Sequence, residues 1–272
     1  MKGWYERIRE TAAFLKERGA DPKAMIVLGT GLGGLGDRLE QSVRIPYEEI
    51  PHFPVSTSPS HAGELVLGRC GPIQVVAMHG RFHYYEGYDL KDVTFPVRVA
   101  HALGAGTLLV TSAVGGMNPL YQRGEIVAID DHINMMGDSP LRGENDERLG
   151  PRFPDMSAPY DAALLDRAEA LARDAGYRLP RAVLVAVMGP QLETRAEYRW
   201  LRSMGADVVG MSSVPEAIVA AHCGMRTLAL SVVTDICLPD ALEPVDVAEI
   251  IATANAAAPR LESLLLSLVQ DV

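Results

Sequence analysis

The sequence predicts a single α/β domain over residues 1–272, with a mixed central β-sheet flanked by helices on both faces. Two observations lead to this prediction. Short apolar runs of strand length alternate with helical patterns along the whole chain. No linker rich in proline, glycine or serine divides the chain, and 272 residues is a length that one α/β domain can fill.

The elements of the first half follow from periodicity and turn residues. An amphipathic opening helix, with Ile8, Ala12 and Leu15 near one face, ends at Gly19. Two apolar runs split by Gly71-Pro72 predict a hairpin. The other predicted elements of this half are a helix, Phe95–Leu103, and the strands Ala24–Leu28, Leu65–Cys70, Ile73–Met78 and Thr107–Thr111.

Strands and helices continue to alternate in the second half. The least regular stretch, Asn134–Pro159, is polar and holds four prolines, which predicts a long functional loop. The closing helix, Val247–Val269, is expected to be interrupted near Pro259. The remaining predicted strands are Ile126–Ile129, Ala182–Met188, Val208–Met211 and Arg226–Thr234, and the remaining helices are Asp161–Ala175, Arg195–Met204 and Val214–His222.

The charge balance excludes two classes of partner. The chain has 25 Lys+Arg against 35 Asp+Glu and a formal net charge of −10, so it lacks the basic footprint of a nucleic-acid or anionic-membrane binder. With 48% hydrophobic and 22% charged residues, the composition also excludes wholesale disorder. Any anion must therefore be bound by local groups, because the negative net charge of the whole chain repels it.

The cysteines and the apolar runs indicate the cellular compartment of the protein. Cys70, Cys223 and Cys237 are odd in number and form no CxxC pair, which argues against structural zinc and a disulfide framework. We expect small buried side chains in a reducing compartment. No apolar run approaches the ~20 residues of a membrane span, and the charged N-terminus is unlike a signal peptide. A cytoplasmic protein is therefore expected.

The first candidate site is the glycine turn Gly29–Gly34, directly after a predicted strand. Its spacing satisfies GxGxxG, but a dinucleotide site also needs a second strand ending in an acid about 20 residues on. Glu48 lies at that distance but follows Pro46, which is unsuited to a central strand. Two alternatives remain: a turn whose backbone N–H groups and Thr30 hydroxyl meet one phosphate, and a plain tight turn.

The second candidate is Gly80–Gly87. In extended backbone Arg81, His83 and Tyr85 point to one side, and this combines an anion clamp, a hydrogen-bonding ring and an aromatic wall. His61 could join them from a loop. A single histidine in this chain is more simply a satisfied structural residue, but the grouping of three favours a site.

Four further motifs also follow predicted strands, at the strand ends where α/β sheets bind ligands. Three of them have an ordinary structural alternative: a tight turn for Thr111–Gly116, a helix cap for Glu193 or Thr194, and a loop cap for Asp235. The motifs are Thr111–Gly116, Gly189–Thr194, Val209–Ser212 and Ser231–Asp235.

Taken together and in order, these motifs resemble the trimeric purine nucleoside phosphorylase family, which includes the methylthioadenosine phosphorylases. The resemblance covers nearly the whole chain, and eight weak motifs in register make it specific. It implies a nucleoside phosphorylase-like fold and a glycosyltransferase of purine salvage. Such an enzyme converts a purine (2′-deoxy)ribonucleoside and phosphate into free base and (deoxy)ribose 1-phosphate, with no metal or organic cofactor. The motifs are GTGLGGL, HAGEL, GRFHYYEGY, TSAVGGMNP, GPRFPDM, GPQLET, VGMSSVPE and VVTD.

The resemblance also implies roles for individual residues. His83, Glu193 and Asp235 are the implied catalytic residues; Glu193 would accept a purine N1–H, and Asp235 would face N7 and the 6-substituent. Phe153 would complete a neighbouring subunit's sugar pocket, which implies a homotrimer. The phosphate set is Thr30, His61, Arg81, His83, the Ala113 backbone N–H and Ser212, and the other substrate-binding residues are Tyr85, Val209, Met211 and Val247.

Two positions depart from the family pattern. Asp235 stands where 6-oxopurine enzymes usually have Asn, and an ionised Asp can only accept hydrogen bonds. Val247 stands where many relatives carry a histidine for the 5′-hydroxyl, and an apolar group suits a 5′-methylthio or 5′-deoxy substituent better. Glu193 nevertheless favours a protonated N1, so inosine or guanosine is the predicted substrate, with adenosine or 5′-methylthioadenosine as the alternative.

Two other classes of function stay open at this point. A non-catalytic purine-binding protein on the same fold would lack the phosphate set, whose Thr30, Arg81, His83 and Ser212 are present here. An NAD-dependent oxidoreductase rests on GxGxxG alone.

Overall fold

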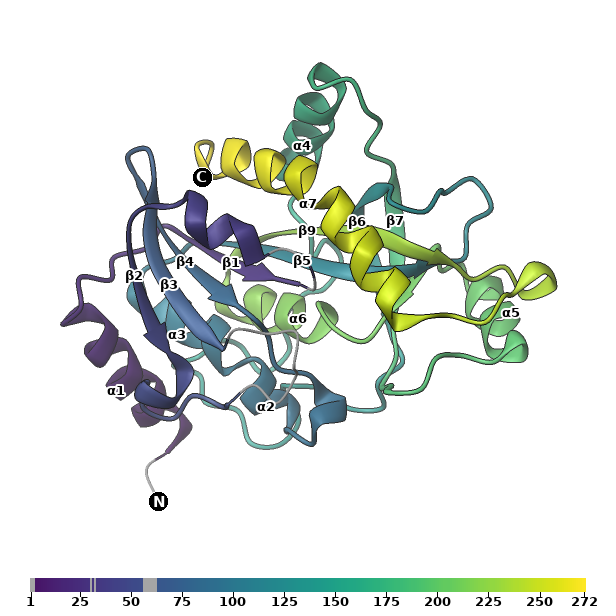
Figure 1. Ribbon diagram of the computed structural model, residues 1–272. Coiled ribbons are helices and arrows are strands. Elements are labelled where there is room, and N and C mark those ends of the chain that lie inside the picture. Colours follow the sequence, from purple (N-terminus) through teal and green to yellow (C-terminus); the bar gives the residue numbers. More distant parts are fainter. Residues whose placement is uncertain (1–2, 30, 32, 56–62) are drawn as a thin grey trace.

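A computed structural model describes residues 3–29, 31, 33–55 and 63–272. In this part of the chain nine strands form one mixed sheet in the order β2-β3-β4-β1-β5-β8-β7-β6-β9, with an additional pairing between β5 and β9 (Figure 1). The predicted mixed α/β architecture is confirmed. The strands are β1 (Ala24–Leu28), β2 (Glu40–Pro46), β3 (Glu64–Cys70), β4 (Ile73–His79), β5 (Thr107–Gly116), β6 (Ile126–Asn134), β7 (Arg181–Ala186), β8 (Val208–Gly210) and β9 (Arg226–Ile236).

The longest-range feature of the sheet is a ring of five strands. β5 pairs in parallel with β9 over its whole length, β9 pairs with β6, β6 with β7, β7 with β8, and β8 returns to β5. The remaining strands, β1 to β4, extend this ring as an open wing through the pairing of β1 with β5. Alternation of elements along the sequence could not show this closure, because every closing pair joins distant segments.

β5 changes partner along one of its edges. That edge pairs with β1 over Thr107–Val110 and then with β8 at Gly115 and Gly116, while the opposite edge stays on β9. The two partners diverge between Val110 and Gly115, so the sheet separates there. This is the part of β5 that faces the cavity described below.

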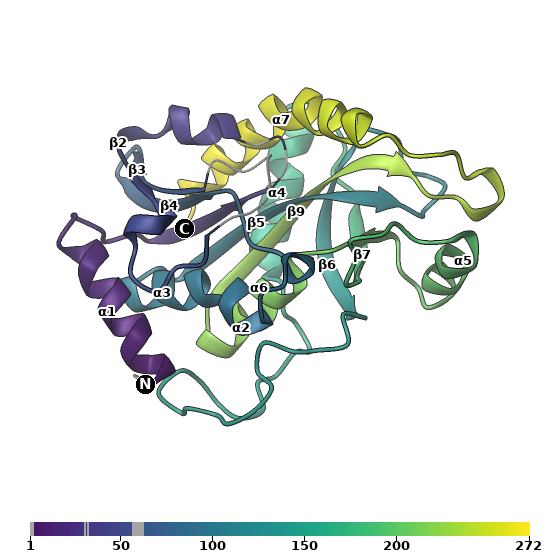
Figure 2. The same cartoon turned by 60° about the horizontal axis from the view of Figure 1, so that its bottom comes forward.

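Helices cover both faces of the sheet, as predicted. In Figure 2, α1, α2, α3 and α6 lie on one face and α4 and α7 on the other, with α5 at one end of the molecule. None of the helices in the described ranges is long and apolar enough to cross a membrane. The helices are α1 (Trp4–Lys16), α2 (Leu90–Val93), α3 (Phe95–Leu103), α4 (Ala162–Asp174), α5 (Arg195–Ser203), α6 (Val214–Cys223) and α7 (Val247–Val269).

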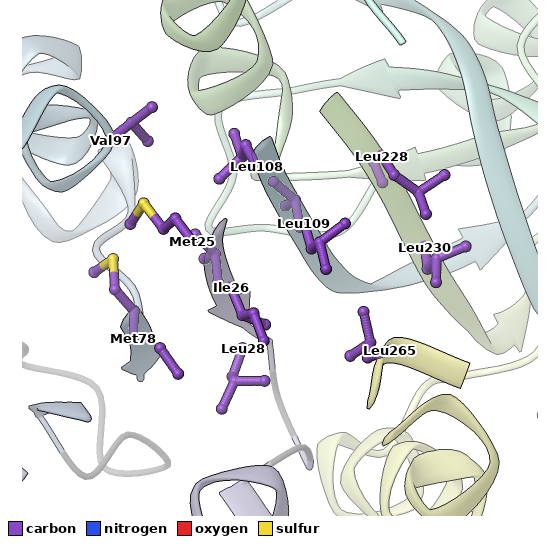
Figure 3. Packing of buried hydrophobic residues seen from close by; sticks show 14 of the residues in the cluster. Met25, Ile26, Leu28, Met78, Val97, Leu108, Leu109, Leu228, Leu230 and Leu265 are labelled. Carbon is purple, nitrogen blue, oxygen red and sulfur yellow. The ribbon is translucent and has the colours of Figure 1, made fainter. Parts of the chain in front are cut away.

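The main core lies between the sheet and its helices. Leu109 of β5 and Leu228 and Leu230 of β9 are fully buried, and Leu265 of α7 lies against this part of the sheet (Figure 3). Removing each such side chain from water stabilises the fold by about 1.5–3 kcal/mol. The cavity is therefore built on strands that pack into the main core.

Several predicted boundaries need correction. α7 is continuous through Pro259, so the expected interruption is wrong. Pro259 is exposed and removes a single backbone hydrogen bond, whereas Ala258 and Leu261 beside it are buried against the core and hold the helix together. β5, β6 and β9 extend beyond Thr111, Ile129 and Thr234, the predicted strand Ala182–Met188 ends at Ala186, and β2 and α2 were not predicted.

The dinucleotide interpretation of Gly29–Gly34 is wrong on topology. After β1 the chain enters a 3-10 helix, Gly33–Arg38, and then β2, which pairs antiparallel with β3 at the sheet edge. Glu48 lies in a second 3-10 helix, Tyr47–Glu49, and does not end a parallel strand. Pro46 is the last residue of an edge strand, a position where its missing N–H is tolerated.

Candidate active site

One cavity of about 170 Å³ lies at the carboxyl ends of the central strands. β1, β5, β8 and β9 contribute the residues at their ends, and the segments that follow β4 and β7 complete the wall. Most of the predicted site residues therefore meet in one place. Those that line the cavity are Arg81, His83, Tyr85, Ala113, Glu193, Val209, Met211, Ser212 and Asp235.

Two predicted site residues within the described part of the chain do not line the cavity. Phe153 is 85% exposed on the long loop that joins β6 to α4. Val247, the first residue of α7, is 64% exposed; Ile250, one turn further, lines the cavity instead. Thr30 and His61 lie outside the described residues.

Arg81 organises one end of the cavity. Its side chain is almost fully buried, and Nη1 donates to Ser212 Oγ at 2.5 Å and to Ser213 Oγ at 3.2 Å. Nη2 lies 3.4 Å from Oε1 of Glu216, which is also buried. Burial lowers the pKa of Arg81, and the Glu216 carboxylate opposes that shift. Because the Ser212 hydroxyl accepts from the guanidinium, it keeps its own proton to donate to a bound anion.

The turn between β8 and α6 places Ser212 at the cavity. Ser213 has φ +70°, a left-handed value that is rare for a residue with a side chain. Residues held in this way cluster at functional sites and cost of order 1–3 kcal/mol. α6 begins directly afterwards, at Val214, so the partly positive N-terminal end of a ten-residue helix lies beside the arginine.

His83 and Tyr85 line the cavity together with Arg81. His83 Nδ1 lies 2.9 Å from Oε1 of Glu86, and because an ionised carboxylate only accepts, Nδ1 carries the proton. This leaves Nε2 to accept from a ligand, or to donate when the ring is protonated. The Tyr85 ring stacks on His83 with centroids 4.7 Å apart and 13° between the planes. Burial raises the pKa of Tyr85, so its phenol stays neutral.

The structure shows why the first residue of the turn after β1, Gly29, is a glycine. Its N–H donates to Thr111 Oγ1 at 2.9 Å. A Cβ at position 29 would lie 2.8 Å from the Thr111 carbonyl oxygen and 2.9 Å from Ser112 Cα, which no real side chain tolerates. Glycine is therefore required for β1 to approach β5 at the cavity wall.

Two carboxylates also line the cavity. Asp235 lies near the end of β9, and its Oδ1 accepts from Thr234 Oγ1 at 2.9 Å. Its Oδ2 accepts from Cys237 Sγ at 3.0 Å. Glu193 faces the same space, and burial, assisted by the charge of Asp235, raises the pKa of Glu193. The two carboxylates offer hydrogen-bond acceptors to a ligand.

The helix-cap alternative for this motif applies to Thr194 alone. The Thr194 hydroxyl accepts from the Glu197 N–H at 3.3 Å, and the Glu197 carboxylate accepts from the Thr194 N–H at 2.7 Å. This reciprocal capping box begins α5. Glu193 precedes the cap and faces the cavity.

The cavity thus combines an anion-binding end, an acceptor end, and Tyr85, Val209 and Met211 in the wall. Residues 23–270 match a family model described as the phosphorylase superfamily. Purine nucleoside phosphorylase 1 of Bacillus subtilis (strain 168) is 51% identical over 231 residues, which are 85% of this chain and 85% of that protein. The chain belongs to the purine nucleoside phosphorylase family.

Solved structures of the purine nucleoside phosphorylase family agree with this assignment. Two structures of a schistosoma purine nucleoside phosphorylase each align with a TM-score of 0.93 and 36% identity, covering 98% of this chain and 97% of theirs. One is a complex with hypoxanthine, and the other, from Schistosoma mansoni, is a complex with adenosine.

Some residues of the cavity region were not predicted from the sequence. Glu216 lies within the motif VGMSSVPE but became visible only as the buried partner of Arg81. Cys237 is buried, as expected, yet it also donates to Asp235. Tyr198 and Ile250 line the cavity from α5 and α7. The helical spacing of Val247 and Ile250 is the one signal that could have identified Ile250.

The positive φ at Ser213 leads to a first prediction. Ser213→Gly and Ser213→Ala both remove the hydroxyl that accepts from Arg81, but only glycine relieves the backbone conformation. We expect the glycine variant to be more stable than the alanine variant by about 1 kcal/mol. Urea unfolding of both variants measures the difference. Equal midpoints with equal slopes would show that the backbone at residue 213 is not strained.

Proposed function

We propose that this protein cleaves purine nucleosides with inorganic phosphate, releasing the free base and (deoxy)ribose 1-phosphate. The observation that carries the proposal is a single cavity lined both by the hydrogen-bonded pair Arg81 and Ser212 and by the carboxylates of Glu193 and Asp235. Membership of the purine nucleoside phosphorylase family supports the same reaction. The proposed chemistry uses phosphate as co-substrate and needs no metal or organic cofactor.

Phosphate would bind at the arginine end. Arg81 supplies one fixed positive charge, and the Ser212 hydroxyl and the Ala113 N–H supply further donors, with Thr30 and His61 as additional predicted ligands. His83 Nε2 would donate as well when the ring is protonated. Neutral donors hold the anion while leaving an oxygen nucleophilic. As the C1′–N9 bond breaks, positive charge develops on the sugar, and the bound phosphate dianion stabilises it before forming the C1′–O bond.

The ribose would lie between the two ends. Tyr85, Val209 and Met211 line this part of the cavity. We assign Phe153 to the sugar pocket of a neighbouring subunit in a homotrimer, which fits its 85% exposure in the single chain. Val247 and Ile250 share one side of α7, so the 5′ substituent of the sugar would meet apolar side chains there.

The purine would leave at the carboxylate end. The electron pair of the breaking C1′–N9 bond moves onto the base, so hydrogen bonds to the base strengthen in the transition state. Glu193 would accept from N1–H, and Asp235 would accept from a protonated N7 or a 6-amino group. A protonated N1 occurs in 6-oxopurines, so inosine or guanosine is the proposed substrate. Asp235 and Val247 favour the alternative, adenosine or 5′-methylthioadenosine.

A substrate panel tests the proposed reaction. Free-base release is measured from inosine, guanosine, adenosine and 5′-methylthioadenosine, with and without phosphate. We expect release only when phosphate is present, and faster release from inosine or guanosine. A protein that binds purines without catalysis would release no base from any of the four. Preferential turnover of adenosine or 5′-methylthioadenosine would establish the alternative specificity.

Replacing Asp235 by Asn tests how the base is selected. An amide can donate to O6 while accepting from N7–H, whereas an ionised carboxylate accepts only. Asp235→Asn should therefore raise the kcat/KM ratio of inosine to adenosine by about 10-fold, the scale of one hydrogen bond. Steady-state kinetics with both nucleosides measure the ratio. If the ratio does not change, Asp235 has no part in specificity.

The shared sugar pocket leads to a prediction about assembly. Sedimentation velocity should show a trimer, and Phe153→Ala should raise the nucleoside KM by about 10-fold through loss of an aromatic contact. Val43→Ala, at an exposed position of the edge strand β2, is the matched control and should leave KM unchanged. An active monomer, or an unaltered KM in Phe153→Ala, would contradict the shared pocket.

A further inference from the structure

Two carboxylates in one small cavity pose an electrostatic problem. Glu193 and Asp235 both line the space where the base would bind, and the charge of Asp235, together with burial, raises the pKa of Glu193. A carboxyl group that takes up a proton becomes a donor and presents the wrong pattern to an N–H group of the base. The protein therefore needs donors of its own that keep both groups ionised.

Cys237 supplies such a donor to Asp235. Its Sγ lies 3.0 Å from Asp235 Oδ2, and Thr234 Oγ1 lies 2.9 Å from Oδ1. Both oxygens of the carboxylate thus have a protein donor. Cys237 is 1% exposed, and burial together with Asp235 raises the pKa of its thiol, so the thiol keeps its proton. This cysteine is placed to donate.

Tyr198 supplies the donor to Glu193. It extends from α5 with 2% exposure, lines the cavity together with Glu193, and belongs to the same buried cluster as Cys237. Hydrogen bonding from Tyr198 lowers the pKa of Glu193 and opposes the effect of burial. The hydroxyl has one proton, and a bond to a charged oxygen is about twice as strong as one to a neutral acceptor. The phenol proton is therefore available to Glu193, and the thiol proton is donated to Asp235.

We propose that Tyr198 and Cys237 are positioning residues that hold Glu193 and Asp235 as hydrogen-bond acceptors for the purine and so determine which bases bind. This inference rests on the proposed function, because it assumes that a purine occupies the carboxylate end. It adds two residues to the determinants of base specificity.

The charges around Glu193 give the sign of the effect. Asp235 from β9 and Glu197 from α5 face it and, together with burial, disfavour its ionised form; the buried Cys237 thiol adds no charge. Tyr198 is the neighbouring side chain whose hydrogen bond favours the ionised form. Replacing Tyr198 by Phe should therefore raise the pKa of Glu193 further. As pH falls, Glu193 in this variant takes up its proton at a higher pH than in the wild type.

Binding of free bases measures this change in the pKa of Glu193 without any catalytic turnover. Hypoxanthine offers N1–H and needs ionised Glu193, whereas the N1 of adenine accepts and gains from protonated Glu193. Isothermal titration calorimetry with both bases is carried out across a pH series from about 5 to 8. In Tyr198→Phe we expect hypoxanthine binding to weaken about 10-fold near the acid end and to recover toward the alkaline end. Adenine binding should hold or improve.

Matched variants separate positioning from packing. Cys237→Ala removes the thiol donor and should alter the hypoxanthine-to-adenine preference, and Cys237→Ser, which keeps a donor, should restore it. Tyr121→Phe removes another buried hydroxyl, one that donates to the Arg181 carbonyl at 2.8 Å away from the cavity, and should leave both bases unaffected. If Tyr198→Phe does not fold, the comparison of Ala and Ser at position 237 decides.

Two negative results have different meanings. If wild-type protein binds neither base and releases none from the nucleoside panel, the proposed function fails. If the wild type binds base but Tyr198→Phe weakens both bases equally at every pH, or if Cys237→Ser behaves like Cys237→Ala, Tyr198 and Cys237 serve packing alone and the inference is overturned.

Discussion

The pairing of β5 is the constraint on which the rest of the molecule depends. One edge stays on β9 for ten residues, while the other passes from β1 to β8 and leaves Thr111–Val114 between the two partners. Closing the five-strand ring through β8 brings the residues after β7 and β8 to the same place as those after β1 and β4. The cavity follows from this change of partner, and the glycine at position 29 lets β1 come close enough to form its wall.

The acidic character of the chain is compatible with anion binding because the relevant charge is local. The formal net charge is −10, yet the anion end is built from one arginine whose position is set by a buried glutamate and two serines. Pairing with Glu216 offsets part of the free-energy cost of burying the Arg81 guanidinium. The serine hydroxyls that accept from the guanidinium keep their own protons for donation to the ligand. The carboxylates at the other end keep this positive centre distinct from the place where N–H groups of the base are recognised.

Much of the fold and site could be predicted from the sequence, because both leave local signals. Periodicity located the strands and most helices, and the strand-end motifs supplied residues such as Arg81 and Asp235 that meet in one cavity. What could not be predicted depends on contacts between distant segments. The ring closes through non-local pairs, and α7 continues past Pro259 because both flanks are packed. Tyr198 of α5 and Cys237, directly after β9, share one buried cluster although they are far apart in the sequence.

The close packing of Gly115 against Cys237 constrains how this site can evolve. A Cβ at Gly115 would lie 2.6 Å from the cysteine sulfur, so a side chain cannot arise at 115 while the sulfur stays in place. Substituting residue 115 first requires a smaller residue at 237, which would remove the donor to Asp235. Positions 115, 235 and 237 should therefore vary together among descendants of this sequence. A change of base preference would then be recorded as a correlated set of substitutions across β5 and β9.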